Sequence, residues 1–298
     1  MKKDRFGNLT INTKQNISAY LFMLPALFFF FVFVVVPIVM GLITSFFDYT
    51  SKNFEFSGLT NYLNLFKDEY FIKSVKNTLF LVVVSVPIIV LLSLFISVVL
   101  YQRSAITRSI FRGIYYLPVV TGTVAVVVVW KWLFDPYYGV LNYVLQKLGI
   151  INEGIVWLGN EKFAIWAIII ILITTSVGQP IILYIAALGN VDVSQVEAAK
   201  IDGATNWQVF KYVKWPGILP TTLYVVVITT INTFQCFSLI QLLTNGGPDK
   251  STSTVMYLVY ETAFKNYKYG YANAMGVVLA IFIGIFSLVQ FRMFRSKD

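Results

Sequence analysis

Residues 77–102 read NTLFLVVVSVPIIVLLSLFISVVLYQ, a run of 26 residues without a charged side chain. A charge in the middle of a lipid-spanning helix costs roughly 2.5 to 3.5 kcal/mol on insertion scales, so a long neutral run is typical of a membrane span. A hydrocarbon core of about 30 Å requires about 20 such residues in helical conformation. Residues 77–102 are therefore predicted to form a transmembrane helix.

Five further stretches of the chain also lack charged residues. They lie between Lys14 and Asp48, Arg112 and Lys131, Lys162 and Asp192, Lys214 and Asp249, and Lys268 and Arg292. The stretch that starts after Arg112 is the shortest. The first stretch follows a basic segment but is too long for a secretory signal and has no small-residue cleavage site, so we expect it to be retained. The pattern predicts an all-α membrane protein with about six transmembrane helices.

The overall composition excludes several classes of function. The 298 residues are 57% hydrophobic and 12% charged, with a mean hydropathy of +0.73. There is no histidine, and Cys236 is the one cysteine, so an internal disulfide, a zinc cluster and a histidine-based catalytic site are excluded. No catalytic or metal-ligating residue is predicted. The 23 basic residues are spread between apolar runs instead of forming a patch for nucleic acid, which we do not expect as a partner.

The distribution of basic residues predicts the orientation of the chain. Six spans place successive connecting segments on alternate sides of the membrane. The side with both termini then carries 13 basic and five acidic residues, and the other side carries ten basic and nine acidic residues. All six arginines fall on the first side. Because cytoplasmic loops are enriched in Lys and Arg, we expect both termini, including a short segment of residues 1–17, to be cytoplasmic. Residues 61–75 and 250–268 mix apolar and charged residues and suit helices at the membrane surface.

One polar cytoplasmic segment, between the fourth and fifth spans, has clear local chemistry. Ser194 with Glu197, and Thr205 with Gln208, fit capping boxes that begin two short helices. Gly203 lies between them, where a helix commonly ends in a left-handed residue. The segment WPGILP at 215–220 contains two prolines, which we interpret as helix breaks at the return into the bilayer. This local chemistry fits an ordinary connecting hairpin as well as a docking element.

The motifs EAA at 197–199, DGA at 202–204 and ILP at 218–220 resemble the EAA loop of binding-protein-dependent ABC importer permeases. One departure is that Asp192 and Val193 stand where many relatives have Ile-Pro. The resemblance implies a type I permease fold over residues 18–298 of a bacterial plasma membrane protein. It also implies that a coupling loop at about 188–217 docks on a separate ATPase, through Glu197, Ala198, Ala199, Asp202 and Gly203.

Three further groups of residues resemble the carbohydrate-uptake branch of that family, in the subunit type of the maltose and glycerol-phosphate permeases. They are GLTNY at 58–62 with Asn77 and Thr78; YLP at 116–118 with Trp130, Gly139, Asn142 and Gly149; and LTNGGP at 243–248 with Ala263, Phe264 and GYA at 270–272. The resemblance covers nearly the whole chain. It implies a second, different permease subunit, an ATPase dimer, an extracytoplasmic binding protein and a sugar or oligosaccharide as the solute.

Uncharged polar residues within the spans are candidates for the solute pathway, because a polar side chain there needs a partner or a water-lined cavity. On the fifth span Thr229, Asn232, Thr233 and Cys236 fall within an arc of about 100° at 3.6 residues per turn, and Gln235 is adjacent. On the fourth span Ser176 and Gln179 flank Gly178, which with Pro180 suits a helix interruption. The same residues would also suit hydrogen bonding between helices, worth about 0.6 to 2 kcal/mol each.

Other transport mechanisms require residues that this sequence lacks. The loop GGPDKS at 246–251 lacks the glycine before lysine that a phosphate-binding loop requires, so we expect no cofactor in this chain and ATP with Mg²⁺ in a partner. An ion-coupled secondary transporter usually has Asp, Glu or His within its spans, and these spans have none. Hydroxyls and amides without neighbouring charge favour a neutral sugar over an anion such as glycerol 3-phosphate, which stays an alternative.

Overall fold

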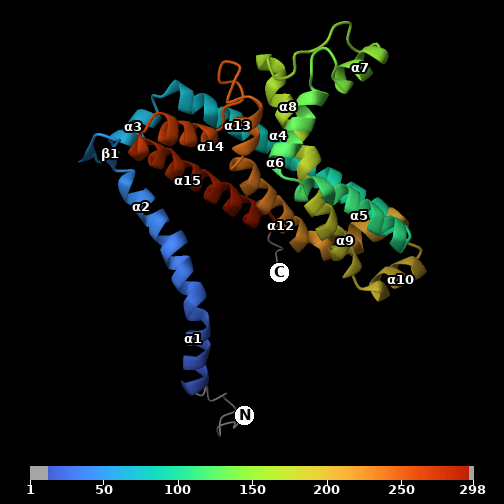
Figure 1. Ribbon diagram of the computed structural model, residues 1–298. Coiled ribbons are helices and arrows are strands. Elements are labelled where there is room, and N and C mark those ends of the chain that lie inside the picture. The colour runs from blue at the N-terminus through green and yellow to red at the C-terminus, as the bar shows by residue number, and fades with distance from the viewer. Residues whose placement is uncertain (1–12, 295–298) are drawn as a thin grey trace.

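The computed structural model describes residues 13–294, and the regular secondary structure of these residues is helical apart from one short hairpin (Figure 1). The elements are α1 Thr13–Phe30, η1 Phe31–Val35, α2 Val36–Thr44, β1 Phe47–Tyr49, β2 Phe54–Phe56, α3 Thr60–Leu65, α4 Glu69–Tyr101, α5 Ala105–Val120, α6 Thr123–Leu133, α7 Val140–Lys147, α8 Glu161–Ser176, α9 Gly178–Gly189, α10 Val193–Ile201, α11 Asn206–Val209, η2 Phe210–Lys214, α12 Trp215–Phe234, α13 Ser238–Leu243, α14 Val255–Tyr260, η3 Glu261–Lys265 and α15 Tyr269–Phe294. The η elements are single π-helical turns.

Five of the predicted spans correspond to continuous helical segments that are long and apolar enough to cross a bilayer. Within the described residues these segments are Tyr20–Thr44, Glu69–Tyr101, Glu161–Gly189, Asn206–Phe234 and Tyr269–Met293. The first segment contacts α15 near its C-terminal end and otherwise extends away from the other helices (Figure 1). No residue in its most apolar 18-residue window is buried within the chain. Because α1 and α2 are so apolar, lipid or another protein must cover them.

The third predicted span, between Arg112 and Lys131, is not a single straight helix. α5 and α6 meet at an angle of 99°, and only together could they make one broken span. Thr121 adopts an extended conformation and Gly122 precedes α6, while Pro118 removes a donor from the last turn of α5. These residues separate the two helices, so the third predicted span is a bent pair of helices and not one straight helix.

α4 is the central helix of the bundle and packs against α8, α9 and α12. Its buried side includes small polar residues at helical spacing, among them Ser85, Ser93 and Ser97. The Ser97 hydroxyl donates to the carbonyl of Ile181 on α9 at 3.1 Å. Small side chains let helices approach closely and supply hydrogen bonds where water is absent, so this face of α4 suits packing within a membrane.

Helices α5 and α9 approach each other closely at Gly178, the first residue of α9. A Cβ atom placed there would lie 2.1 Å from the carbonyl oxygen of Tyr115 on α5. Real Cβ atoms do not approach backbone oxygen so closely, so α5 and α9 can pack in this way only over glycine. The contact holds α5 against α9 at the point where α8 ends.

We therefore expect Gly178→Ala to destabilise the protein strongly, by about 3 kcal/mol, because the backbone of α5 must move to admit one methyl group. Gly276→Ala is the matched control, since a Cβ at Gly276 on α15 would meet nothing within 4 Å. Thermal unfolding in detergent, followed by size-exclusion chromatography, measures both variants. Equal midpoints for the two variants would contradict the close contact.

The bundle has two distinct ends. At the first, which we name the α10 end, Lys214 and Arg108 each lie over the ring of Tyr101, at 5.5 and 5.1 Å from its centroid. This contact gathers the end of α4 and the starts of α5 and α12. At the other end, the hairpin end, β1 pairs antiparallel with β2 and Thr50 forms a bridge with Lys268. Residues 103–112 and 197–214 thus lie together at the α10 end, and residues 48–76 and 249–268 lie together at the hairpin end. The predicted topology requires this grouping, since it assigns the first two segments to one side of the membrane and the other two to the opposite side.

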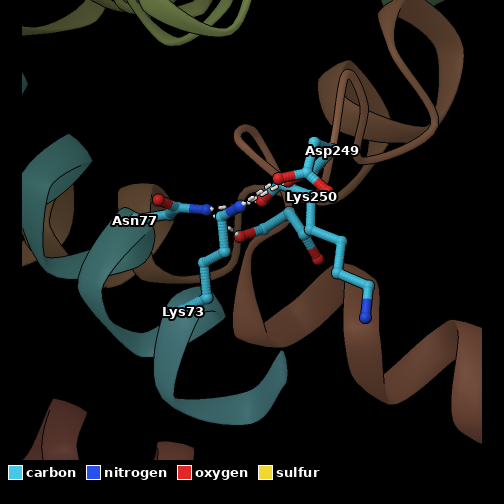
Figure 2. Close-up of polar contacts among 5 residues, drawn as sticks. Lys73, Asn77, Asp249 and Lys250 are labelled. Carbon is cyan, nitrogen blue, oxygen red and sulfur yellow. Dashed lines mark hydrogen bonds and ion pairs between the residues drawn. The ribbon is translucent and has the colours of Figure 1, made fainter. Parts of the chain in front are cut away.

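The loop 244–254 is fastened to α4 at the hairpin end (Figure 2). The amide of Asn77 donates to the carbonyls of Lys250 and Ser253, both at 3.0 Å. Lys73 pairs with Asp249 at 3.0 Å, but both side chains are substantially exposed, so the ion pair contributes little. The Asn77 amide, which satisfies two loop carbonyls, is the stronger attachment. The motif LTNGGP thus begins a well-anchored loop between α13 and α14.

Candidate functional site

A polar cavity of about 260 Å³ lies beside the bend between α5 and α6. Its walls come from four parts of the chain that are distant in sequence, and none of its lining residues is charged. The residues that line it are Pro118, Val119, Thr121, Thr123, Val126, Leu172, Thr175, Ser176, Gln179, Pro180, Leu183, Ile228, Thr229, Asn232, Thr233 and Leu239. We call this space the central cavity.

The central cavity offers hydrogen-bonding groups to a neutral solute. The side chains of Ser176, Gln179 and Asn232 form no hydrogen bond to any other described residue, so their donors and acceptors are available. The Thr233 hydroxyl donates to the carbonyl of Thr229 at 2.8 Å but keeps its acceptor lone pairs. Hydroxyls and amides without charge can bind a polyol, and they offer no countercharge to an ion.

Five of the seven residues predicted for the pathway line this cavity: Ser176, Gln179, Thr229, Asn232 and Thr233. The other two, Gln235 and Cys236, do not. α12 ends at Phe234, so the helical spacing that placed Cys236 on the same face does not extend to it. Cys236 is buried in an apolar cluster, and Gln235 is the exposed residue directly after α12.

The bend between α5 and α6 supplies cavity residues that the sequence did not indicate. Thr121 and Thr123 flank Gly122 at this break, and Thr175 faces the same space from α8. Broken helices are tolerated at membrane depth where their backbone lines a cavity instead of lipid. The signal that could have revealed them is Pro118 followed by Thr121 and Gly122, a helix-breaking combination inside the shortest neutral stretch.

A second candidate region is the exposed hairpin of α10 and α11. Its first helix begins earlier than the predicted capping box. Asp192, not Ser194, is the cap, and its carboxylate accepts from the backbone N–H of Ser194 at 2.9 Å. The hydroxyl and backbone N–H of Ser194 lower the pKa of Asp192 below its ordinary value. An anionic cap is favoured at the positive end of a helix, which explains the earlier start.

The turn and the second helix of this hairpin confirm the prediction. Gly203 has φ +82°, the left-handed conformation expected between the helices. Thr205 and Gln208 form a complete capping box, in which the Thr205 backbone N–H donates to Gln208 Oε1 at 2.7 Å. The helix ends on both sides of the turn are therefore satisfied by residues within the segment.

The prolines that follow do not break the helix, contrary to the prediction. Residues 206–234 form one continuous helical segment that contains Pro220 in its interior. Pro216 directly follows the π-helical turn 210–214, where the regular ladder of helical hydrogen bonds is already interrupted. One continuous helical segment thus joins the α10–α11 hairpin to Thr229 and Asn232 in the central cavity.

α10 is not covered by the rest of the chain. None of its residues is buried, and two large apolar side chains face outward, with Val193 61% and Ile201 86% exposed. Glu197, Ala198 and Asp202 are exposed as well, and Ala199 is partly covered. Apolar side chains on a small projecting hairpin are typical of a surface that another protein covers.

Membrane-length helices around an uncharged polar cavity define the class of helical membrane transport proteins. Residues 71–296 match the family described as binding-protein-dependent transport system inner membrane component, and the chain belongs to that family. Two curated relatives are a probable ABC transporter permease of Pyrococcus horikoshii, 34% identical over 88% of this chain and 90% of the relative, and the lactose transport system permease LacF of Rhizobium radiobacter, 32% identical over 95% of both.

The fold of a solved transporter agrees with this assignment. A chain of a bacterial ABC transporter for import of the acidic polysaccharide alginate superposes with a TM-score of 0.80 at 26% identity, over 95% of this chain and 96% of that one. The predicted all-α membrane protein with a type I permease fold is confirmed. The chain is a transport subunit and an inner-membrane component.

Proposed function

We propose that this chain is the permease subunit through which an ABC importer moves a sugar or oligosaccharide. The observation that carries this proposal is the central cavity, lined by hydroxyl and amide groups without a charge. Several relatives are named for such solutes: the lactose permease above, the multiple sugar-binding transport system permease MsmF of Streptococcus mutans at 34% identity, and the arabinooligosaccharide permease AraP of Bacillus subtilis at 28%.

The α10–α11 hairpin is the proposed docking site for an ATPase dimer. Its exposed surface carries Glu197, Ala198, Ala199, Asp202 and Gly203, and the segment 206–234 connects it directly to the central cavity. A push on α10 would therefore tilt α12 and move Asn232 relative to α8 and α9. ATP and Mg²⁺ would be bound by the ATPase partner, and this chain itself would hold no cofactor.

A second permease subunit is the proposed cover for the open side of the cavity. Gln179 and Asn232 are exposed in the isolated chain although they belong to membrane-length helices. An amide that faced lipid would be costly, so a subunit with its own polar surface should lie there. An extracytoplasmic binding protein would deliver solute at the hairpin end. One solved relative of 26% identity is a complex with a periplasmic protein bound to an alginate pentasaccharide.

In the proposed orientation the α10 end faces the cytoplasm together with both chain termini. The basic residues of 103–112 and 197–214 gather at this end, as the enrichment of cytoplasmic loops in Lys and Arg requires. The permease domain would cover residues 18–298 and the coupling loop about 188–217. Of the terminal segment 1–17, residues 1–12 lie outside the described part of the chain, as do Arg295 and Lys297.

The test is to purify the chain from its native membrane and to reconstitute the assembly in proteoliposomes. We expect an ATPase and a second permease to co-purify, and binding protein loaded with a neutral sugar to raise ATP turnover several-fold. Stimulation by glycerol 3-phosphate instead would support the anionic alternative. Uptake that follows a proton or sodium gradient without ATP would contradict the importer mechanism.

A further inference from the structure

An apolar groove of about 670 Å³ runs along α4 at the α10 end of the bundle, separate from the central cavity. One wall is formed by α4 and the other by the segment 206–214. The residues that line the groove are Leu91, Leu94, Phe95, Val98, Gln102, Lys200, Asn206, Trp207, Val209, Phe210 and Lys214. Its walls are mostly apolar, and its two cations both come from the α10 end.

The length of the groove matches one leaflet of a bilayer. Leu91, Leu94, Phe95 and Val98 follow one face of α4 from its middle toward its end, and Gln102, the residue directly after the helix, continues this row. At 1.5 Å per residue this row is about 16 Å long, close to half of a hydrocarbon core of about 30 Å. Phe95 is 67% exposed and Leu91 65%, so the row is open to the surroundings of the bundle.

The mouth of the groove is positively charged. Lys200 and Lys214 both line it, and the ammonium of Lys214 lies over the ring of Tyr101, which Arg108 also approaches. Within residues 20–293, neither lysine forms an ion pair, and the two ion pairs found there lie at the hairpin end of the bundle. Like charges gathered without an acidic partner favour a bound anion.

Aromatic residues beside the mouth indicate its level in the membrane. Trp207, Tyr212 and Trp215 alternate with Lys211 and Lys214 in the segment that precedes α12. Trp207 is 68% and Tyr212 67% exposed. Exposed Trp and Tyr among lysines are typical of the boundary between lipid headgroups and hydrocarbon. The cations therefore lie at headgroup depth, and the apolar row of α4 lies beneath them.

We propose that this groove binds one anionic phospholipid of the leaflet at the α10 end. Lys200 and Lys214 would hold its phosphate-bearing headgroup, and the row Leu91 to Val98 would hold an acyl chain. A helix of a partner subunit could cover the apolar row, but an uncharged helix would leave the two lysines without a counterion. Basic pockets between transmembrane helices on the cytoplasmic side are suited to such headgroups.

The position of the site links the lipid to the coupling segment. Lys200 belongs to α10 and Lys214 precedes α12, whereas the floor of the groove belongs to α4. A headgroup held by both lysines would tie the hairpin to the central helix of the bundle. This inference goes beyond the proposed function, and it concerns binding of lipid whether or not the solute is a sugar.

The experiment is native mass spectrometry of the chain in the assembly in which it is extracted. Dioleoylphosphatidylglycerol and dioleoylphosphatidylcholine are titrated together, and the variant Lys200→Gln/Lys214→Gln is compared with the unchanged protein. We expect one phosphatidylglycerol to be retained selectively. A lysine near an anionic headgroup is worth about 1 kcal/mol, so losing two should reduce the preference for phosphatidylglycerol about 30-fold.

The control variant is Lys52→Gln/Lys67→Gln, which removes two exposed lysines at the hairpin end and should leave that preference unchanged. The variant Lys200→Arg/Lys214→Arg keeps the charges and should retain the lipid. The proposal is overturned if the glutamine variant keeps its preference, if the arginine variant loses it equally, or if the unchanged protein retains both lipids alike. Because the readout is bound lipid, it does not depend on sugar transport or ATP turnover.

Discussion

Gly203→Pro should abolish solute-stimulated ATP turnover and uptake by the assembled transporter, with the chain still folded and membrane-inserted. Gly203 has φ +82°, whereas proline is restricted to φ near −65°, and its N–H donates to the Lys200 carbonyl at 3.1 Å. Forcing proline into this turn would cost about 3 kcal/mol, enough to shift the population of the observed hairpin roughly a hundredfold. α10 would then point away from the ATPase surface.

The matched control is Gly149→Pro, at the end of α7. Gly149 has φ +68°, its N–H donates to the Gln146 carbonyl at 3.0 Å, and a Cβ would meet nothing within 4 Å, as at Gly203. The two substitutions therefore impose the same backbone strain on different loops. Stimulated ATP turnover is compared in proteoliposomes after equal amounts of folded protein are confirmed. Full activity of the Gly203 variant would remove this hairpin from the coupling mechanism.

Asn232→Leu should reduce uptake of the solute about tenfold or more and leave ATP turnover without solute unchanged. The substitution keeps the size of the side chain but removes an amide that faces the central cavity and has no partner among the described residues. Leaving a bound solute hydroxyl without its hydrogen-bond partner costs about 1 to 3 kcal/mol, which corresponds to about five- to 150-fold.

Gln235→Leu provides the comparison, because Gln235 is an exposed amide less than one turn further along that does not line the cavity. We expect its uptake to stay within about twofold of the unchanged protein, since surface substitutions of this kind have small effects. Initial rates of labelled sugar uptake distinguish the two variants. If both variants lose uptake equally, or if Gln235→Leu alone loses it, the cavity is not the route of the solute.

Much of the fold followed from local physics that is visible in the sequence. Neutral runs predicted about six spans, because a charge in lipid is costly wherever it occurs along the chain, and five of them are continuous helical segments. The Gly203 turn and the Thr205 capping box were also predicted, because a cap depends on residues within one or two turns. The cap at Asp192 was not predicted, because Asp192 and Ser194 lie two residues apart and the side chain of either can cap the start of α10.

The candidate site was only partly predictable. Polar residues on α8, α9 and α12 could be recognised as unusual within apolar helices, and five of them line the cavity. The sequence could not show that Cys236 lies beyond the end of α12, since helical spacing presumes a helix that continues. It also could not show that the break at Thr121 and Gly122 turns the chain by 99°.

The sequence by itself determined which segments enter the membrane, where the polar hairpin lies and which chemical groups are available to a solute. Those properties depend on the transfer of single side chains and on hydrogen bonds within a few residues. Only the tertiary structure decided that the bend between α5 and α6 forms a cavity with α8, α9 and α12, and that 206–234 is one helical segment joining this cavity to the hairpin. The angle at a break depends on packing between distant segments, such as the contact of Gly178 with Tyr115.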